Sequence, residues 1–274
     1  MRFSLLVLSL LLPTAAFADA DAVAAKVREL MDAYDNPVLG ELLRLERSHG
    51  APIAAAKVPN NSDAVYDAKA EKVLLNSDLI DINDKALIAC GMGEDRRTWM
   101  LAVQLLPTVA HEQRHAYVKW RLAEDVGGWL PSTIEEEVVG FTNTVDVYEK
   151  LRLSDLFKDA FTQPCATTYN AAFYKIHRTA WQDASDGVDG LTGFLNGSSY
   201  YSKMCSLRKS EDVSACRRAA EANLASAKPE ERDEAQKIAG FWGDDSRIAK
   251  ARKYFESVEF VRTRRIFAAR KALP

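Results

Sequence analysis

The sequence predicts an α+β fold that is predominantly helical, with a small sheet and extra helices in its C-terminal portion. Apolar residues recur at helical spacing over most of the chain, whereas residues 72–76 are the clearest strand candidate. The 274 residues are 47% hydrophobic and 27% charged, which suits one large core or two smaller ones. We find no internal repeat and no low-complexity segment.

Helix boundaries follow from capping and stop signals. Gly50 closes the second expected helix, and Ser132 or Thr133 caps the helix that carries three glutamates in its first turn. Pro107 interrupts the central helical pattern, and Pro107-Thr108 can restart a helix there. The expected helices are 22–34, 38–48, 97–123, 134–151, 167–181, 210–227, 229–242 and a last long one ending at residue 270.

The first 18 residues predict a secretory signal peptide. Arg2 is followed by an apolar run over 5–12 and by the small-x-small cleavage signal Ala16-Phe17-Ala18. The run is shorter than the about 20 residues that span a bilayer. Cleavage after Ala18 leaves 35 basic and 39 acidic residues, a net charge of −4.

Charge and hydropathy restrict the partners of the mature chain. A mildly acidic protein without a basic stripe is a poor binder of nucleic acid. No later segment combines spanning length with an absence of charge, so we expect no stable membrane insertion. The short, Ala-rich leader favours the periplasm as the compartment.

The four cysteines predict two structural disulfides. An even number in an exported chain is typical of disulfide bonding, and no Cys-x2-Cys pair suggests a zinc ribbon. Cys205 and Cys216 are close enough to join a helical hairpin, which leaves Cys90 and Cys165 as the other pair. Three pairings are open to the sequence alone.

The main functional motif is His111-Glu112-Gln113-Arg114-His115. On a helix, His111 and His115 lie about 40° apart and one turn apart, so both imidazoles can reach one zinc ion. Glu112 lies about 100° away, where it can act as the base for metal-activated water. Val118 and Leu122 continue the histidine face as an apolar stripe, so the ligands should point towards a partner helix.

A third ligand is expected from the glutamates at 135–137. The buried stripe of the next helix starts at Ile134, and Glu137 lies about 60° from it, whereas Glu135 and Glu136 lie farther round. Glu137 is therefore the predicted ligand, with Glu135 as the alternative. The other two acids are interpreted as a solvated first turn favoured by the helix dipole. Gly140 should let a neighbouring helix approach closely.

His111-Glu112-x-x-His115 followed by a glutamate on the next helix resembles the gluzincin metallopeptidases. Residues 113–117 and 134–141 are similar to small bacterial metallopeptidase domains, over about 70 to 80 residues in all. The resemblance implies Zn²⁺ bound by His111, His115 and Glu137, with Glu112 as general base. It also implies that the strand at 73–76 pairs with an extended peptide. Phe141 stands where many gluzincins have an Asp or Asn that orients a ligand histidine, so another group must supply that bond or the metal is held less tightly.

The sequence thus predicts a signal peptide at 1–18, a zincin-like domain at 19–155 and a helical portion at 156–274 packed on the same core. The predicted function is hydrolysis of peptide bonds in a peptide or protein substrate by an exported zinc metallopeptidase. The alternatives are a metal-binding module without turnover and a metal-free envelope protein stapled by disulfides. His177 or a tyrosine at 200–201 is the candidate donor to the substrate oxyanion.

Overall fold

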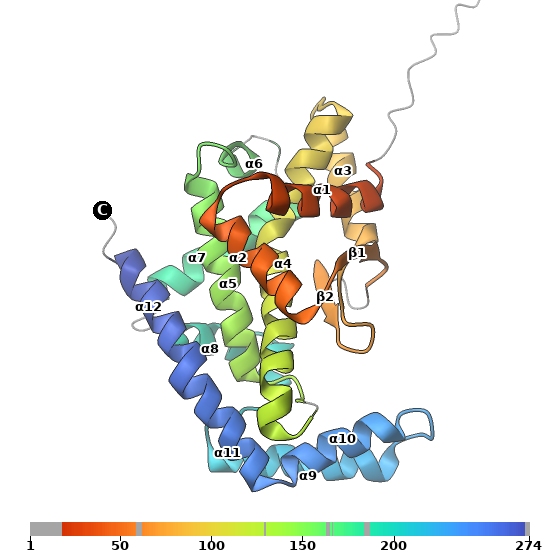
Figure 1. Cartoon of the computed structure of the whole chain (residues 1–274), viewed down its shortest axis with the longest axis vertical. Helices are drawn as coiled ribbons and strands as arrows, with labels where there is room; N and C mark the ends of the chain where they lie inside the picture. The colour runs from red at the N-terminus through yellow and green to blue at the C-terminus, as the bar shows by residue number, and fades with distance from the viewer. Residues whose placement is uncertain are drawn as a thin grey trace, which may run out of the picture.

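A computed structural model describes residues 18–271 except 59–61, 129, 163–164, 166 and 184–186. Apart from its last residue, the predicted signal peptide at 1–18 lies outside the described residues. The fold is predominantly helical with one three-stranded sheet, which confirms the predicted α+β class (Figure 1). The N-terminal elements are α1 (Ala20–Ala33), α2 (Pro37–His49), β1 (Ile53–Ala56), β2 (Ala64–Asp67), β3 (Lys72–Asn76), α3 (Ser77–Ala89), α4 (Glu94–Val126) and α5 (Ile134–Leu153). The C-terminal elements are α6 (Asp159–Thr162), α7 (Thr168–Asp183), α8 (Val188–Asn196), the 3-10 turn η2 (Tyr201–Lys203), α9 (Ser210–Ser226), α10 (Arg232–Trp242), α11 (Asp245–Tyr254), the π-helical segment η3 (Phe255–Glu259) and α12 (Phe260–Lys271).

The sheet has the strand order β1-β3-β2. β3, the strand predicted at 72–76, is central: β1 pairs with it in parallel and β2 in antiparallel orientation. The expectation that this strand offers an open edge to a peptide is therefore wrong, since both of its edges are occupied. The sequence does not predict the short strands β1 and β2, because four residues show too little alternation of apolar and polar side chains. Among the described residues, no strand pairs with the outer edge of β2, and β2 contacts α4.

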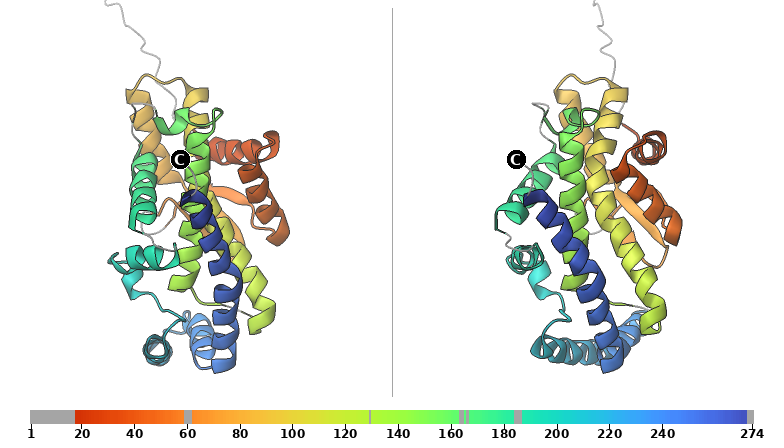
Figure 2. Two further views of the ribbon diagram at one scale, coloured as in Figure 1. Left: turned by 90° about the vertical axis from the view of Figure 1, so that its left-hand side faces the viewer. Right: turned by 60° about the vertical axis from the view of Figure 1, so that its left-hand side comes forward.

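Helices α4 and α5 run side by side through the length of the molecule (Figures 1 and 2). α4 continues through Pro107 without a break, which corrects the predicted interruption. A proline inside a helix costs about 3 kcal/mol. Residues 100–111 of α4 are buried on every side, and their packing offsets the lost hydrogen bond.

Buried apolar residues form two clusters, and both clusters include residues of α4 and α5. One gathers α1, α2, the sheet, α3 and the first half of α4, up to Ala110. The other starts at Val118 and gathers the second half of α4, the first half of α5 and the helices from α8 onwards. Residues 111–115 lie between the clusters. α12 runs obliquely beside α4 and α5 (Figure 2). α9 and α10 form a hairpin at the end of the molecule where α4 ends.

The buried charge of Arg114, in the middle of the motif, is neutralised from the C-terminal helices. Arg114 Nη2 lies 2.5 Å from both carboxylate oxygens of Glu259, at the end of η3. The hydroxyl of Tyr254 donates to the same carboxylate at 2.7 Å. Arg114 therefore makes a structural contact that binds α4 to the C-terminal helices.

Both predicted disulfides are present, Cys90–Cys165 and Cys205–Cys216. Among the described helices, none has the length and apolar character needed to cross a membrane.

Candidate metal centre

The three motif side chains converge on one point of α4. His111, Glu112 and His115 each offer a ligand atom, and these atoms lie within 4.8 Å of one another. Both histidines are buried, and their ring centroids are 4.5 Å apart. They face α5, as the apolar stripe through Val118 and Leu122 predicts.

Glu137 of α5 faces both imidazoles. Its Oε2 lies 3.3 Å from Nε2 of His111, and its Oε1 lies 3.8 Å from Nε2 of His115. Burial opposes the ionised form of Glu137, but the charge of His115 and the hydrogen bond from His111 lower its pKa below the usual value. The helix phase thus selected the glutamate that meets the histidines; its role as a ligand stays a prediction.

Gly140 makes this approach possible. A Cβ atom on Gly140 would lie 2.7 Å from Cε1 of His111, so any larger residue would displace the imidazole. The ring of Phe141 stands edge-on to the same imidazole, with centroids 4.8 Å apart. The expected close approach at Gly140 is confirmed, and His111 is held between the backbone of α5 and an aromatic ring.

The remaining ring nitrogens point to other groups of α5. Nδ1 of His115 lies 2.9 Å from Oε1 of Glu136, and Nδ1 of His111 lies 3.3 Å from the hydroxyl of Thr144. Glu136 therefore supplies the orienting bond that Phe141 cannot supply. Burial alone would lower the pKa of His115, but the carboxylates of Glu137 and Glu136 outweigh it and raise that pKa to about 9.

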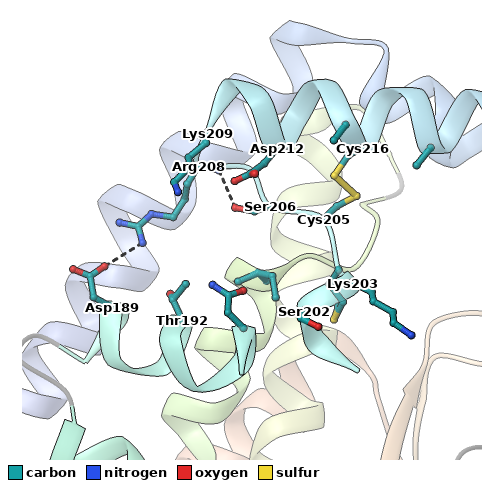
Figure 3. A pocket seen from close by; sticks show the side chains of 15 residues that line it. Asp189, Thr192, Ser202, Lys203, Cys205, Ser206, Arg208, Lys209, Asp212 and Cys216 are labelled. Atoms are coloured by element: carbon teal, nitrogen blue, oxygen red, sulfur yellow. Dashed lines mark hydrogen bonds and ion pairs between the residues drawn. A yellow bond between two sulfur atoms is a disulfide. The ribbon is translucent and has the colours of Figure 1, made fainter. Parts of the chain in front are cut away.

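The expectation that Glu135 and Glu136 form a solvated first turn is wrong, because both are buried. Glu135 Oε1 accepts hydrogen bonds from the Ser206 hydroxyl at 2.7 Å and from the Leu207 amide at 3.0 Å. Ser206 lies beside the Cys205–Cys216 disulfide (Figure 3). It lines a cavity whose volume is about 870 Å³. Helix phase places Glu135 and Glu136 away from the main buried stripe of α5, but that side of α5 is buried as well. Glu135, the alternative ligand, is hydrogen-bonded to the segment that holds Ser206 and Leu207.

Glu112 lies against the open edge of the sheet. Its Oε2 accepts a hydrogen bond of 2.7 Å from the backbone amide of Tyr66 in β2. Burial, together with the negative charge of Glu137, raises the pKa of Glu112, although the two histidines oppose this. A carboxyl group with a raised pKa is suited to accept a proton near neutral pH.

Two adjoining cavities open beside these groups, with volumes of about 280 Å³ and 240 Å³. His111, Glu112 and Tyr201 line both, and Lys119, His115 and Glu137 line the first. Burial and the nearby carboxylates raise the pKa of Tyr201, so its hydroxyl stays protonated. Nε2 of His177, the other candidate donor, instead lies 3.6 Å from Oε2 of Glu149. Glu149 is about three turns beyond Glu137 on α5.

Comparison with models of known families, with curated proteins and with solved structures finds no match to this chain.

Proposed function

We propose that this protein is an exported zinc-dependent metallopeptidase of the gluzincin type. The observation that carries the proposal is the convergence of His111, His115 and Glu137, beside a half-buried Glu112 and a cavity. Export is supported by the two disulfides and by the leader at 1–18. The periplasm remains the compartment that this leader favours.

The donor set fits zinc. Two imidazole nitrogens and one carboxylate are the usual protein ligands of catalytic zinc, with a further position left for water or substrate. The electrostatics agree, because the pocket already favours a positive charge: the pKa of His115 is raised to about 9. His111, His115 and Glu137 would hold the ion, with Glu136 and Thr144 orienting the two imidazoles.

Zinc would supply a Lewis acid that polarises a carbonyl group and makes a water molecule acidic at neutral pH. Glu112 would take the proton of the attacking water and pass it to the leaving amine. Tyr201 lines both cavities, and its hydroxyl would donate to the oxygen of the polarised carbonyl.

The edge of β2 supports a peptide as substrate. The Asn76 amide donates to the Asp63 carbonyl, so the pair Asp63 and Asn76 faces inward in the antiparallel ladder. Hydrogen-bonded pairs alternate along such a ladder, and the backbone groups of Ala64 and Tyr66 therefore point to the open edge. The amide of Tyr66 already donates to Glu112, which leaves the Tyr66 carbonyl and the backbone groups of Ala64 for an extended peptide, and that peptide would lie beside Glu112.

The test is zinc stoichiometry on protein prepared free of metal, followed by peptidase assays. We expect about one zinc per chain in the wild type, no tight zinc in His115→Ala, and retained zinc in His177→Gln. Cleavage of a mixed peptide library should then disappear in Glu112→Gln without loss of zinc. No zinc in the wild type would refute the proposal and favour a metal-free envelope protein. Zinc without cleavage would favour the binding module, in which Tyr66 keeps Glu112 occupied.

A further inference from the structure

The second cavity beside the metal centre differs from the first in its walls. It shares His111, Glu112 and Tyr201 with the first cavity but extends away from Lys119, His115 and Glu137. Its other walls come from α5, α7 and the start of β2, and Phe141, Phe173, Ile176 and Asp63 are among the residues that line it. At about 240 Å³ it is the size of one large side chain with room for water.

The cavity has hydrocarbon and acidic walls. Phe141, Phe173 and Ile176 provide hydrocarbon surface, and Asp63 and Glu112 provide carboxylates. The sheet holds Asp63 in place, because its backbone carbonyl accepts the amide of Asn76 at 2.9 Å. The cavity therefore suits a side chain that combines an apolar stem with a polar end.

Asp63 has no cationic partner among the residues that the structure describes. Burial, and after it the like charge of Glu112, raises the pKa of Asp63 to about 6. A positively charged side chain bound in the cavity would offset the repulsion between Asp63 and Glu112, and it would replace the solvation that Asp63 loses on burial. An acidic guest would face two carboxylates, and an aliphatic one would leave Asp63 unpaired.

We propose that this cavity selects a lysine or arginine side chain of the substrate, adjacent to the bond that Glu112 and the metal attack. The aliphatic stem lies between Phe173 and Ile176, and the cationic end pairs with Asp63. This inference rests on the proposed function and adds the substrate class. The specificity residue is Asp63, which touches the side chain of the substrate and not its reacting atoms.

The test uses two peptide hydroxamates that chelate the metal and differ only in having lysine or norleucine beside the chelating group. Norleucine has the lysine stem without the charge. Binding to the zinc-loaded protein is measured by fluorescence polarisation of labelled probes, so that turnover is not needed. We expect the lysine probe to bind about ten- to a hundred-fold more tightly, as a hydrogen bond to a charged group provides.

Asp63→Asn should bring the ratio of the two affinities close to one, chiefly by weakening binding of the lysine probe. The matched control is Asp81→Asn, an exposed carboxylate on α3 that lines neither cavity, which should keep the wild-type ratio. Equal binding of both probes to the wild type, or a ratio that survives Asp63→Asn, would overturn the inference. Failure of both probes to bind, by contrast, would count against the metal site itself. Circular dichroism of each variant verifies the fold.

Discussion

Replacing Gly140 by alanine tests whether the packing of α5 on His111 holds the metal centre together. The new Cβ would lie 2.7 Å from Cε1, 2.8 Å from Nε2 and 2.9 Å from Nδ1 of His111. These distances are too short for van der Waals contact, so the imidazole has to move. Phe141 stands edge-on to the ring and Thr144 contacts its Nδ1, which leaves the ring little room to move within the pocket.

The magnitude follows from two opposing terms. Alanine in place of glycine inside a helix contributes about 0.5–1 kcal/mol of stability. Overpacking a buried contact costs about 1–3 kcal/mol, so the metal-free protein should lose about 0 to 2.5 kcal/mol. Zinc affinity should fall more sharply. Loss of an orienting group alone typically costs about 10- to 100-fold in metal affinity, and a displaced ligand should cost at least as much.

The assay is competition for zinc against a chelating dye, with thermal unfolding of the metal-free and zinc-loaded forms. Gly40→Ala is the matched control, because Gly40 lies in α2 and a Cβ there meets nothing within 4 Å. It should stabilise the protein by about 0.5–1 kcal/mol and leave zinc affinity unchanged. If Gly140→Ala binds zinc as tightly as the wild type, His111 is not a zinc ligand held in place by this contact.

Three further outcomes are expected. Glu136→Gln should weaken zinc binding about 10- to 100-fold, because Nδ1 of His115 loses its charged partner; unchanged affinity by dye competition would count against that role. The metal-free protein should lose stability as the pH rises from about 6.5 to about 9, because the folded state raises the pKa of His115 and so favours its protonated form; flat denaturation midpoints over this window would contradict it. Glu259→Ala should cost about 3–5 kcal/mol in urea unfolding, because Arg114 is left buried without its counter-charge, and a loss below about 1 kcal/mol would show that water reaches it.

Local pattern was enough to predict most helices and the core of the candidate site. Helix geometry alone places His111 and His115 on one face, and the phase of the next helix singles out Glu137. Thr133 was one of two predicted caps, and its hydroxyl does accept the amide of Glu136. These features concern residues within one element, where a 3.6-residue period relates sequence directly to position.

Tertiary structure alone decided which elements meet. Helix phase suggests that Glu135 is solvated because it reports only the main buried stripe, and it says nothing of the segment with Ser206 and Leu207 that contacts this residue. The open edge beside Glu112 belongs to β2, four residues long, whose place depends on pairing with β3. Asp63 and Tyr201 lie about 50 and 90 residues from Glu112 in sequence, and no periodicity connects them.

The difference between what the sequence determines and what the tertiary structure decides has a physical basis. Secondary structure and capping arise from interactions over a few residues, so the sequence itself determines the helices and the pairing of the two motif histidines. The walls of the cavities, the burial of Glu135 and Glu136 and the continuity of α4 through Pro107 arise from packing between distant segments. That packing overrides local preference whenever the buried surface contributes more free energy than the local term costs.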